Sequence, residues 1–337
     1  MLVVRAARQS DHDAFVELAS AAGSGFTSLA VSAEALDEKL AKSEAAFEGR
    51  ITDPGDAVYQ LMIEDEDSGE ILGTAAVKAQ IGVKKPYFDF KIMTLAQASR
   101  EADRRFDMNV MLLVNDFAGC TEVGSLFVRD KARGTGAGRL IAQSRYLLIA
   151  AARERFGDRL ISELRGVVSD DGSSPFFEHV TRPFFHMSFD EADRLSASTD
   201  NQFILDLMPV HPIYLELLPE AARNVVGKTH PHGVGAHKLL EWEGFEYDRY
   251  VDIFDGGPLV SCRTDKVRTL RESHLAPVGE LSAAAPYKAI ISNNRLPDFR
   301  VAFADLQIGQ GGCGADEKVR RVLNLNAGDT ARYWVKS

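Results

Sequence analysis

The chain has 337 residues, of which 45% are hydrophobic, so it is long enough for two domains with an ordinary globular core. It carries 39 Lys and Arg against 49 Asp and Glu, a net charge of -10. This acidic balance argues against non-specific binding of nucleic acid or anionic lipid, and it favours a small-molecule substrate.

The three cysteines are far apart and form no C-x-x-C pair, so neither a disulfide framework nor a cysteine zinc site is indicated. Charges interrupt the apolar residues of the N-terminus, and no apolar run approaches the ~18 residues of a membrane span. We therefore expect a cytoplasmic protein with no membrane partner.

The chain begins with the pattern of a strand and two helices. Residues 2–6 form an apolar run typical of a strand, and Ser10 or Asp11 caps a helix that ends at Gly23. A second helix is predicted over residues 32–47, with its apolar residues on one face.

The next segments are a loop and a predicted hairpin. Residues 23–29 are rich in glycine and hydroxyl groups, and their place after the first helix makes them a candidate rim of a substrate site. Residues 59–64 and 71–81 are β-rich and flank a charged turn, which predicts a hairpin. The aromatic and charged segment 84–106 matches no single element.

A strand, a glycine-rich turn and a helix then follow one another. Residues 125–128 form the strand, and apolar residues at helical spacing after the turn predict a helix that ends at Gly157. Glycines at a helix start let N–H groups approach an anion, and the helix dipole adds partial positive charge. The turn therefore predicts a phosphate site made of Arg133, Gly134, Gly136 and Gly138.

The spacing of the glycines indicates which kind of phosphate-containing ligand the turn could bind. No Gly-Lys-Ser/Thr follows, so the turn is not a P-loop, and no early βαβ unit surrounds it, so it is a poor dinucleotide fingerprint. The pattern Arg-x-x-Gly-x-Gly after a strand resembles the acyl-CoA loop of the GNAT acyltransferase superfamily. A plain glycine-rich turn is the alternative.

A second GNAT-like signal lies further along the chain. Residues 236–244 predict a short amphipathic helix ended by glycine, followed by a strand over residues 247–254. With a strand predicted over residues 160–167, the order of elements resembles the GNAT core. The resemblance implies an α+β fold with a mixed, mostly antiparallel sheet that splays at the CoA site. Backbone groups of Leu126, Phe127 and Val128 would bind the pantetheine arm there.

The two GNAT-like signals are separated by a helical insertion at about residues 170–232. A helix begins near Ser174 and Pro175, another is predicted near residues 189–195, and residues 211–214 and 219–226 predict two further short helices. The acyltransferase domain is expected to span residues 1–258. Residues 259–337 predict a small β-rich C-terminal domain, with strands near residues 287–291, 299–304 and 332–335.

The whole chain is similar to the arginine N-succinyltransferase family. The resemblance is carried by residues 23–29, 125–127, 163–167, 174–176, 207–214, 229–231 and 250–258, among which M-P-x-H-P-I-Y and D-I-F-D-G-G-P are highly specific strings. It is clear over about residues 1–260 and looser beyond.

The family resemblance implies transfer of a succinyl group from succinyl-CoA to the α-amine of L-arginine. Succinyl-CoA would be a cosubstrate, and no permanently bound cofactor is expected. The resemblance assigns His230 as proton donor and Leu126 to succinyl-CoA binding, with Thr229 standing where family members have Val. It also implies a homo-oligomer, or a heteromer with a homologous subunit.

The chemistry requires a neutral amine, a stabilised oxyanion and a proton for the leaving thiolate. A histidine that titrates near neutrality supplies that proton, so direct transfer is favoured over an acyl-enzyme. His230, His232 and His237 lie close together but lack the carboxylate pattern of a metal site, so no metal is expected. Surface or capping roles are the alternative for His232 and His237.

Both substrates carry charges that need partners. The succinyl carboxylate calls for a cation, and the guanidinium calls for a carboxylate. Glu163, Arg165, Ser174 and Asp252 are the candidate substrate-binding residues. A structural ion pair is the alternative for Glu163 and Arg165.

Two rival functions remain open. One is a GNAT enzyme that acylates ornithine, a polyamine or a protein amine. The other is a subunit that binds acyl-CoA without catalysing transfer.

Overall fold

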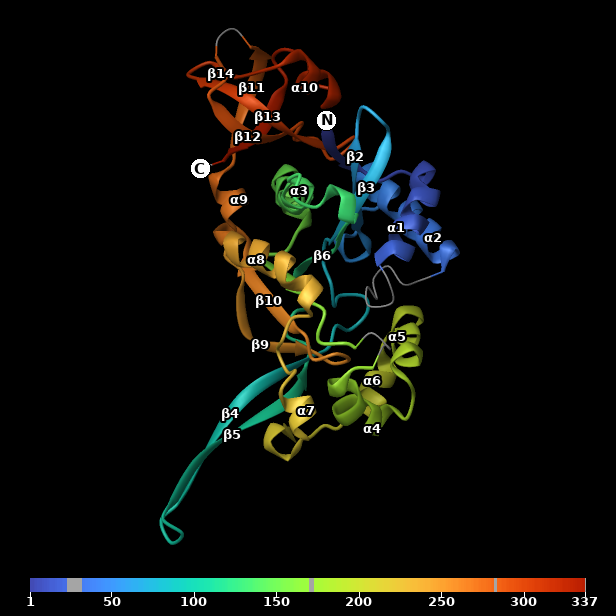
Figure 1. Ribbon diagram of the computed structural model, residues 1–337, viewed down its shortest axis with the longest axis vertical. Helices are drawn as coiled ribbons and strands as arrows, with labels where there is room; N and C mark the ends of the chain where they lie inside the picture. The colour runs from blue at the N-terminus through green and yellow to red at the C-terminus, as the bar shows by residue number, and fades with distance from the viewer. Residues whose placement is uncertain (23–31, 170–172, 282–283, 337) are drawn as a thin grey trace.

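The computed structural model describes residues 1–22, 32–169, 173–281 and 284–336 as a mixed α/β structure (Figure 1). The helices are α1 (His12–Ala22), α2 (Ala33–Phe47), α3 (Ala137–Ala151), α4 (Arg182–Phe185), α5 (Phe189–Ser198), α6 (Gln202–Leu207), α7 (Glu220–Arg223), α8 (Val234–Glu243), α9 (Arg268–Glu272) and α10 (Glu317–Val322). Within the described part of the chain, none combines the length and apolarity needed to cross a membrane.

The strands belong to one extended sheet. They are β1 (Leu2–Ala6), β2 (Val58–Asp65), β3 (Glu70–Lys78), β4 (Asp89–Ser99), β5 (Arg104–Val114), β6 (Thr121–Val128), β7 (Arg159–Glu163), β8 (Ile213–Tyr214), β9 (Glu246–Asp252), β10 (Pro258–Arg263), β11 (His274–Glu280), β12 (Tyr287–Ser292), β13 (Arg300–Gly309), β14 (Gly312–Ala315) and β15 (Thr330–Val335). Their order is β12-β15-β11-β14-β13-β1-β2-β3-β6-β7-β10-β9-β4-β5-β8. Most neighbours are antiparallel, and β6 pairs with β7 in parallel.

The predicted N-terminal elements are confirmed. Strand β1 and helices α1 and α2 occupy the expected segments, and the Ser32 hydroxyl accepts a hydrogen bond from Ala35 N–H at the start of α2. The loop predicted at residues 23–29 lies outside the described residues. The hairpin prediction is also confirmed, because β2 and β3 pair along their length.

The segment at residues 84–106, which the sequence left without an assignment, contains β4 and the start of β5. These two strands form a long hairpin that projects from the rest of the molecule (Figure 1). Only its base is buried: Phe90 is in the core, whereas Phe106 is 48% exposed. The base of this hairpin brings Asp89 beside β9.

Helix α3 ends earlier than predicted. Its last residue is Ala151, and a short 3-10 turn separates it from Gly157. Gly157 is required for a different reason: a side chain there would lie 2.4 Å from the carbonyl oxygen of Gly119. The glycine therefore permits a close backbone approach and does not cap the helix.

Strand β7 is also shorter than predicted. It ends at Glu163, and the chain beyond it turns toward the loop after β9. A side chain at Gly166 would lie 2.4 Å from the carbonyl oxygen of Asp255, so the two loops are in contact. This packing, which pattern alone does not encode, ends the strand.

The insertion is helical, as predicted, with one correction. Residues 211–214 do not form a helix, because Ile213 and Tyr214 form the short strand β8 that pairs with β5. Pro212 lacks an N–H group, and the β-branched Ile213 suits a strand. The predicted helices near residues 189–195 and 219–226 are present as α5 and α7, and Gly244 ends α8 with a positive φ of 101° as expected.

The C-terminal strands close on themselves. Strands β11 to β15 form a ring because β12 pairs with both β15 and β13. Strand β13 also pairs with β1, so the ring continues the main sheet. Strand β10 begins at the predicted boundary after residue 258, yet it pairs with β7 and β9. The exact division into two domains stays a prediction.

Candidate functional site

A cavity of about 210 Å³ lies beside the middle of β6, where β7 and β9 end and α8 begins. Its floor and walls combine apolar side chains, such as Leu126 and Leu240, with several charged groups. The polar and charged residues in its lining are Glu122, Ser125, Arg145, Ser162, Glu163, Arg165, Asp193, His232, Asp252 and Asp255.

Strand β6 carries a β-bulge at this cavity. Two residues of β6, Ser125 and Leu126, face the single residue Ala75 of β3, and Ser125 has a positive φ of 51°. Bulges kink a strand and redirect its side chains, and they are common beside functional sites. Pairing of β6 with β7 ends at Glu122. Residues that follow this point in both strands line the cavity.

The glycine-rich loop at the start of α3 presents free donors. The N–H groups of Gly134, Gly136, Gly138 and Arg139 have no acceptor within the described part of the chain. A side chain at Gly134 or Gly138 would meet nothing within 4 Å. Open N–H groups at the positive end of a 15-residue helix suit an anion such as a phosphate.

A larger cavity of about 890 Å³ adjoins the same loop and the C-terminal ring. Gly136 and Arg139 line one side, and Lys288 and Lys318 line the other. Phe303 of β13 lies 3.3 Å from the place that a side chain at Gly136 would occupy. The C-terminal ring is thus in direct contact with the candidate phosphate loop.

The residues predicted to bind acyl-CoA lie at both cavities and between them. Leu126 lines the smaller cavity, whereas the side chains of Phe127 and Val128 pack into hydrophobic clusters. Arg133 is an exposed loop residue whose guanidinium pairs with Asp130 at 2.9 Å. Gly134, Gly136 and Gly138 form the open loop described above.

His230 stands just before α8, two residues before the cavity-lining His232. Its N–H donates to the carbonyl oxygen of Arg165 at 2.8 Å, which ties it to the loop after β7. Its Nδ1 accepts a hydrogen bond from His232 N–H at 3.2 Å. A neutral His230 with this hydrogen bond carries its proton on Nε2.

His232 lines the cavity. The family resemblance singles out His230, and a surface or capping role was the alternative for His232. The two rings lie 4.9 Å apart in an edge-to-face arrangement. His237 is turned elsewhere: its Nδ1 lies 3.0 Å from the Thr229 hydroxyl. Of the three neighbouring histidines, His232 lines the cavity, and the ring of His230 packs against it.

Three of the four predicted substrate-binding residues line the cavity: Glu163, Arg165 and Asp252. The Nε atom of Arg165 is buried and has no hydrogen-bond partner among the described residues. Ser174 lies elsewhere. It is 1% exposed, and its hydroxyl accepts a hydrogen bond from Phe177 N–H at 3.3 Å, so it caps the helix that the sequence predicted there.

Carboxyl groups give the site its electrostatic character. Burial, together with the charges of Asp252 and Asp89, raises the pKa of Glu163 well above its usual value. Burial and the neighbouring Asp255 raise the pKa of Asp252 to about 8. Burial and Asp252 raise the pKa of Asp193, on α5, to about 6. Several acids therefore compete for protons around one cavity.

Sequence reasoning missed Asp89 and Tyr87. The Asp89 side chain and the Tyr87 hydroxyl are buried beside Glu163, and within the described residues neither has a partner in good hydrogen-bond geometry. The available signal was an acidic residue between Phe88 and Phe90 in a β-rich run, since a buried acid in a strand is unusual unless it has a role.

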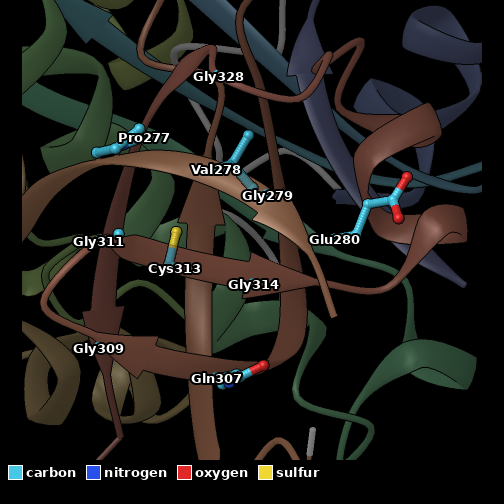
Figure 2. A pocket seen from close by; sticks show the side chains of 11 residues that line it. Pro277, Val278, Gly279, Glu280, Gln307, Gly309, Gly311, Cys313, Gly314 and Gly328 are labelled. Atoms are coloured by element: carbon cyan, nitrogen blue, oxygen red, sulfur yellow. The ribbon is translucent and has the colours of Figure 1, made fainter. Parts of the chain in front are cut away.

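A third hollow, of about 390 Å³, lies in the C-terminal ring and is shown in Figure 2. Six of its eleven lining residues are glycines, and Glu280 is the one carboxyl side chain among them. Cys313 is buried, and burial raises the pKa of its thiol. This hollow lacks the convergent polar groups of a catalytic site.

Comparison with known proteins gives one consistent result. Residues 2–269 match the sequence model of the arginine N-succinyltransferase beta subunit, and residues 274–334 match that of its C-terminal domain. The chain is 36% identical to arginine N-succinyltransferase subunit beta of Pseudomonas aeruginosa, over 98% of this chain and 97% of that protein. It is 34% identical to arginine N-succinyltransferase of Escherichia coli O1:K1, with the same coverage of both chains.

The solved structure of arginine/ornithine succinyltransferase subunit AI from Pseudomonas aeruginosa has the same fold. It superimposes with a TM-score of 0.87 at 32% identity, over 99% of this chain and 98% of that chain. The similarity in sequence and in structure thus extends along the full length of the chain. The chain belongs to the arginine N-succinyltransferase beta subunit family, a family of acyltransferases that use a CoA thioester as cosubstrate.

Proposed function

We propose that this chain transfers the succinyl group of succinyl-CoA to the α-amino group of L-arginine, which yields N2-succinylarginine and free CoA. The observation that carries the proposal is the full-length match to proteins named for this reaction. Family membership establishes an acyltransferase, and the choice of succinyl donor and arginine acceptor follows from the names of the relatives.

Succinyl-CoA would bind across the two cavities of a GNAT-type site. The open N–H groups of Gly134, Gly136 and Gly138 support binding of the CoA phosphates, with Arg133 beside them. The pantetheine arm would follow β6 to the gap between β6 and β7, where backbone groups of residues 126–128 lie. The bulge in β6 and the end of its pairing with β7 support such a splayed site.

Transfer would be direct. The neutral α-amine attacks the thioester carbonyl carbon, a C–N bond forms, the C–S bond breaks, and the amine loses a proton while the thiolate gains one. His230 would donate the proton to the thiolate. The hydrogen bond that its Nδ1 accepts supports this role, because it leaves the proton on Nε2. Glu163, Arg165 and Asp252 would hold the charged ends of the substrates, and no metal takes part.

The protein would act in the cytoplasm as a homo-oligomer or as a heteromer with a homologous subunit. A relative described as one subunit of an arginine/ornithine succinyltransferase supports such an assembly. We also keep the division into an acyltransferase domain (residues 1–258, with the insertion at 170–232) and a C-terminal domain (residues 259–337).

Release of CoA thiol tests the proposal. The full chain is given succinyl-CoA or acetyl-CoA with L-arginine, L-ornithine or no amine. We expect thiol release with succinyl-CoA and arginine. Faster release with ornithine would instead identify ornithine, which is also in the relative's name, as the preferred acceptor. If the chain bound succinyl-CoA but released no thiol in the presence of any amine, it would be a non-catalytic subunit.

Two histidine variants test the proton donor. We expect His230→Ala to lower kcat by about 10²–10⁴-fold, the usual contribution of a general acid. His232→Ala is the matched comparison, because His232 is the neighbouring ring that lines the cavity. Loss of activity only in His232→Ala would transfer the donor role to His232.

A further inference from the structure

Three carboxyl side chains from three different strands gather on one face of the sheet beside the smaller cavity. Asp89 of β4 and Asp252 of β9 are direct partners across the two strands. Glu163, the last residue of β7, interacts with both of them. Glu163 and Asp252 line the cavity, whereas Asp89 lies behind them and is fully buried.

Asp89 is the member that shows the cluster to be incomplete. Among the described residues, neither oxygen of its carboxylate has a partner in good hydrogen-bond geometry, and the same holds for the hydroxyl of Tyr87. Both groups face Glu163, another carboxyl, with which they interact without a well-formed bond. A buried polar group without a partner costs stability and is rare in folded proteins, so it marks a place where a ligand or a role is missing.

The surrounding charges do not complete the cluster. Asp255 accepts N–H bonds from Gly166 and Gly257 at 2.7 and 2.8 Å, and Lys78 pairs with Glu122 at 2.8 Å. These groups satisfy one another. The other charged neighbours are Asp116 and Asp193, both acidic, with Lys39 beside Asp193 and Arg165 beside Asp255. Within the described part of the chain, none of the three carboxyls forms a salt bridge, although the Lys78 ammonium that pairs with Glu122 also interacts with the charge of Glu163.

We propose that Asp89, Glu163 and Asp252 form the cation-binding end of the acceptor site and take the guanidinium group of arginine. Glu163 and Asp252 contact the guanidinium from the cavity. Asp89 is a positioning residue that acts through Glu163. This inference rests on the proposed function, because it presumes an arginine acceptor.

The shape of the cluster suits a guanidinium better than a metal ion. Within the described residues, no three His, Cys, Asp or Glu groups are arranged to hold a metal. A guanidinium is planar and has five N–H donors, which carboxylates on separate strands can accept from different sides. It is also less strongly hydrated than an ammonium, so it enters a buried acidic site at a lower cost.

Arginine binding should release protons. Burial raises the pKa of Glu163 and of Asp89 well above the usual range and that of Asp252 to about 8, so the unliganded cluster binds protons more tightly than free carboxyl groups do. A bound cation stabilises the ionised carboxylates and expels those protons. A purely structural cluster would show no such release.

Steady-state kinetics with Glu163→Gln and Asp89→Asn test the site. We expect each variant to raise KM for arginine at least tenfold, to leave KM for succinyl-CoA within twofold, and to lose the preference for arginine over ornithine. Glu243→Gln is the matched control. Its carboxylate is also buried, but it accepts hydrogen bonds from Thr269 at 2.8 and 2.6 Å outside the cavity lining.

Calorimetric titration of L-arginine into the full chain, in two buffers of different ionisation enthalpy, gives a readout independent of turnover. Wild type should release protons on binding, and Glu163→Gln should bind at least tenfold more weakly with less release. An unchanged KM for arginine with a lower kcat in both variants would overturn the cation site while the proposed function stands.

If the wild-type protein released no thiol in the presence of any amine, the proposed function would be wrong. The titration would then decide the cluster alone. Arginine binding that Glu163→Gln abolishes would support it, and binding that is absent or unaffected would overturn it.

Discussion

Asp252 takes part in two opposing interactions. Its Oδ1 accepts N–H bonds from Phe254 and Asp255 at 2.7 Å each, which favour the ionised form. Burial and the nearby Asp255 oppose ionisation more strongly and raise the pKa of Asp252 from 3.8 to about 8. Folding therefore holds a proton on a group that an unfolded chain would release above pH 4.

The sign of the resulting pH dependence follows from this shift. Between pH 4 and 8 the folded state binds more protons than the unfolded state, so the free energy of unfolding falls as pH rises. We expect Asp252→Asn to flatten this fall by up to about 1.4 kcal/mol per pH unit, the value for one proton. Thermal unfolding of the substrate-free protein at pH 5, 6, 7 and 8 measures it. Parallel curves for wild type and variant would contradict the expectation.

At the scale of elements, the loop before α3 separates two uses of glycine. Gly136 has a φ of 92°, and Phe303 leaves little room for a side chain there. Gly138 lies inside the helix with open space around it. The first glycine is thus required by the backbone and its packing, whereas the second only keeps the approach to the N–H groups open.

Alanine at each position tests this division. We expect Gly136→Ala to cost about 1–2 kcal/mol, the price of a left-handed residue with a side chain. Gly138→Ala should gain up to about 1 kcal/mol of helix stability. Both should raise KM for the CoA thioester, since each adds a methyl group near the donors. Urea unfolding and steady-state kinetics measure the two effects, and an unchanged KM in both variants would place the phosphates elsewhere.

At the scale of the molecule, the C-terminal ring is joined to the rest by packing as well as by the β1–β13 pairing. Trp334 of β15 is 1% exposed and lies edge-to-face against Trp242 of α8, with ring centres 5.5 Å apart. The guanidinium of Arg139 lies near both rings. Ile290, Val301 and Trp334 belong to the same hydrophobic cluster as α3.

Trp334→Ala should therefore lower the free energy of unfolding of the whole molecule and not of the C-terminal ring alone. We expect a loss of about 3–5 kcal/mol, as for other buried aromatic residues. Leu275→Ala, at a 52% exposed position of β11, is the control and should stay within about 0.5 kcal/mol. Urea unfolding followed by tryptophan fluorescence and by circular dichroism measures both. A small loss confined to one probe would indicate that the ring unfolds independently.

Local patterns were sufficient for elements whose stability is local. Ser32 caps α2 and Gly244 ends α8, and both ends were predicted because the signal lies within a few residues. Elements that depend on distant partners were missed or given wrong ends. Strand β8 exists because β5 lies beside it, β7 ends where Gly166 meets Asp255, and the β4–β5 hairpin matches no short motif.

The sequence by itself determined the family, the order of the main elements, the glycine-rich loop and the residues Glu163, Arg165 and Asp252 that line the cavity. Only the tertiary structure decided which groups meet there. Asp89 is distant in sequence from Glu163 and Asp252, and it joins them because β4 pairs with β9. The unsatisfied state of its carboxylate depends on burial by several strands at once, a property that no local pattern of residues encodes.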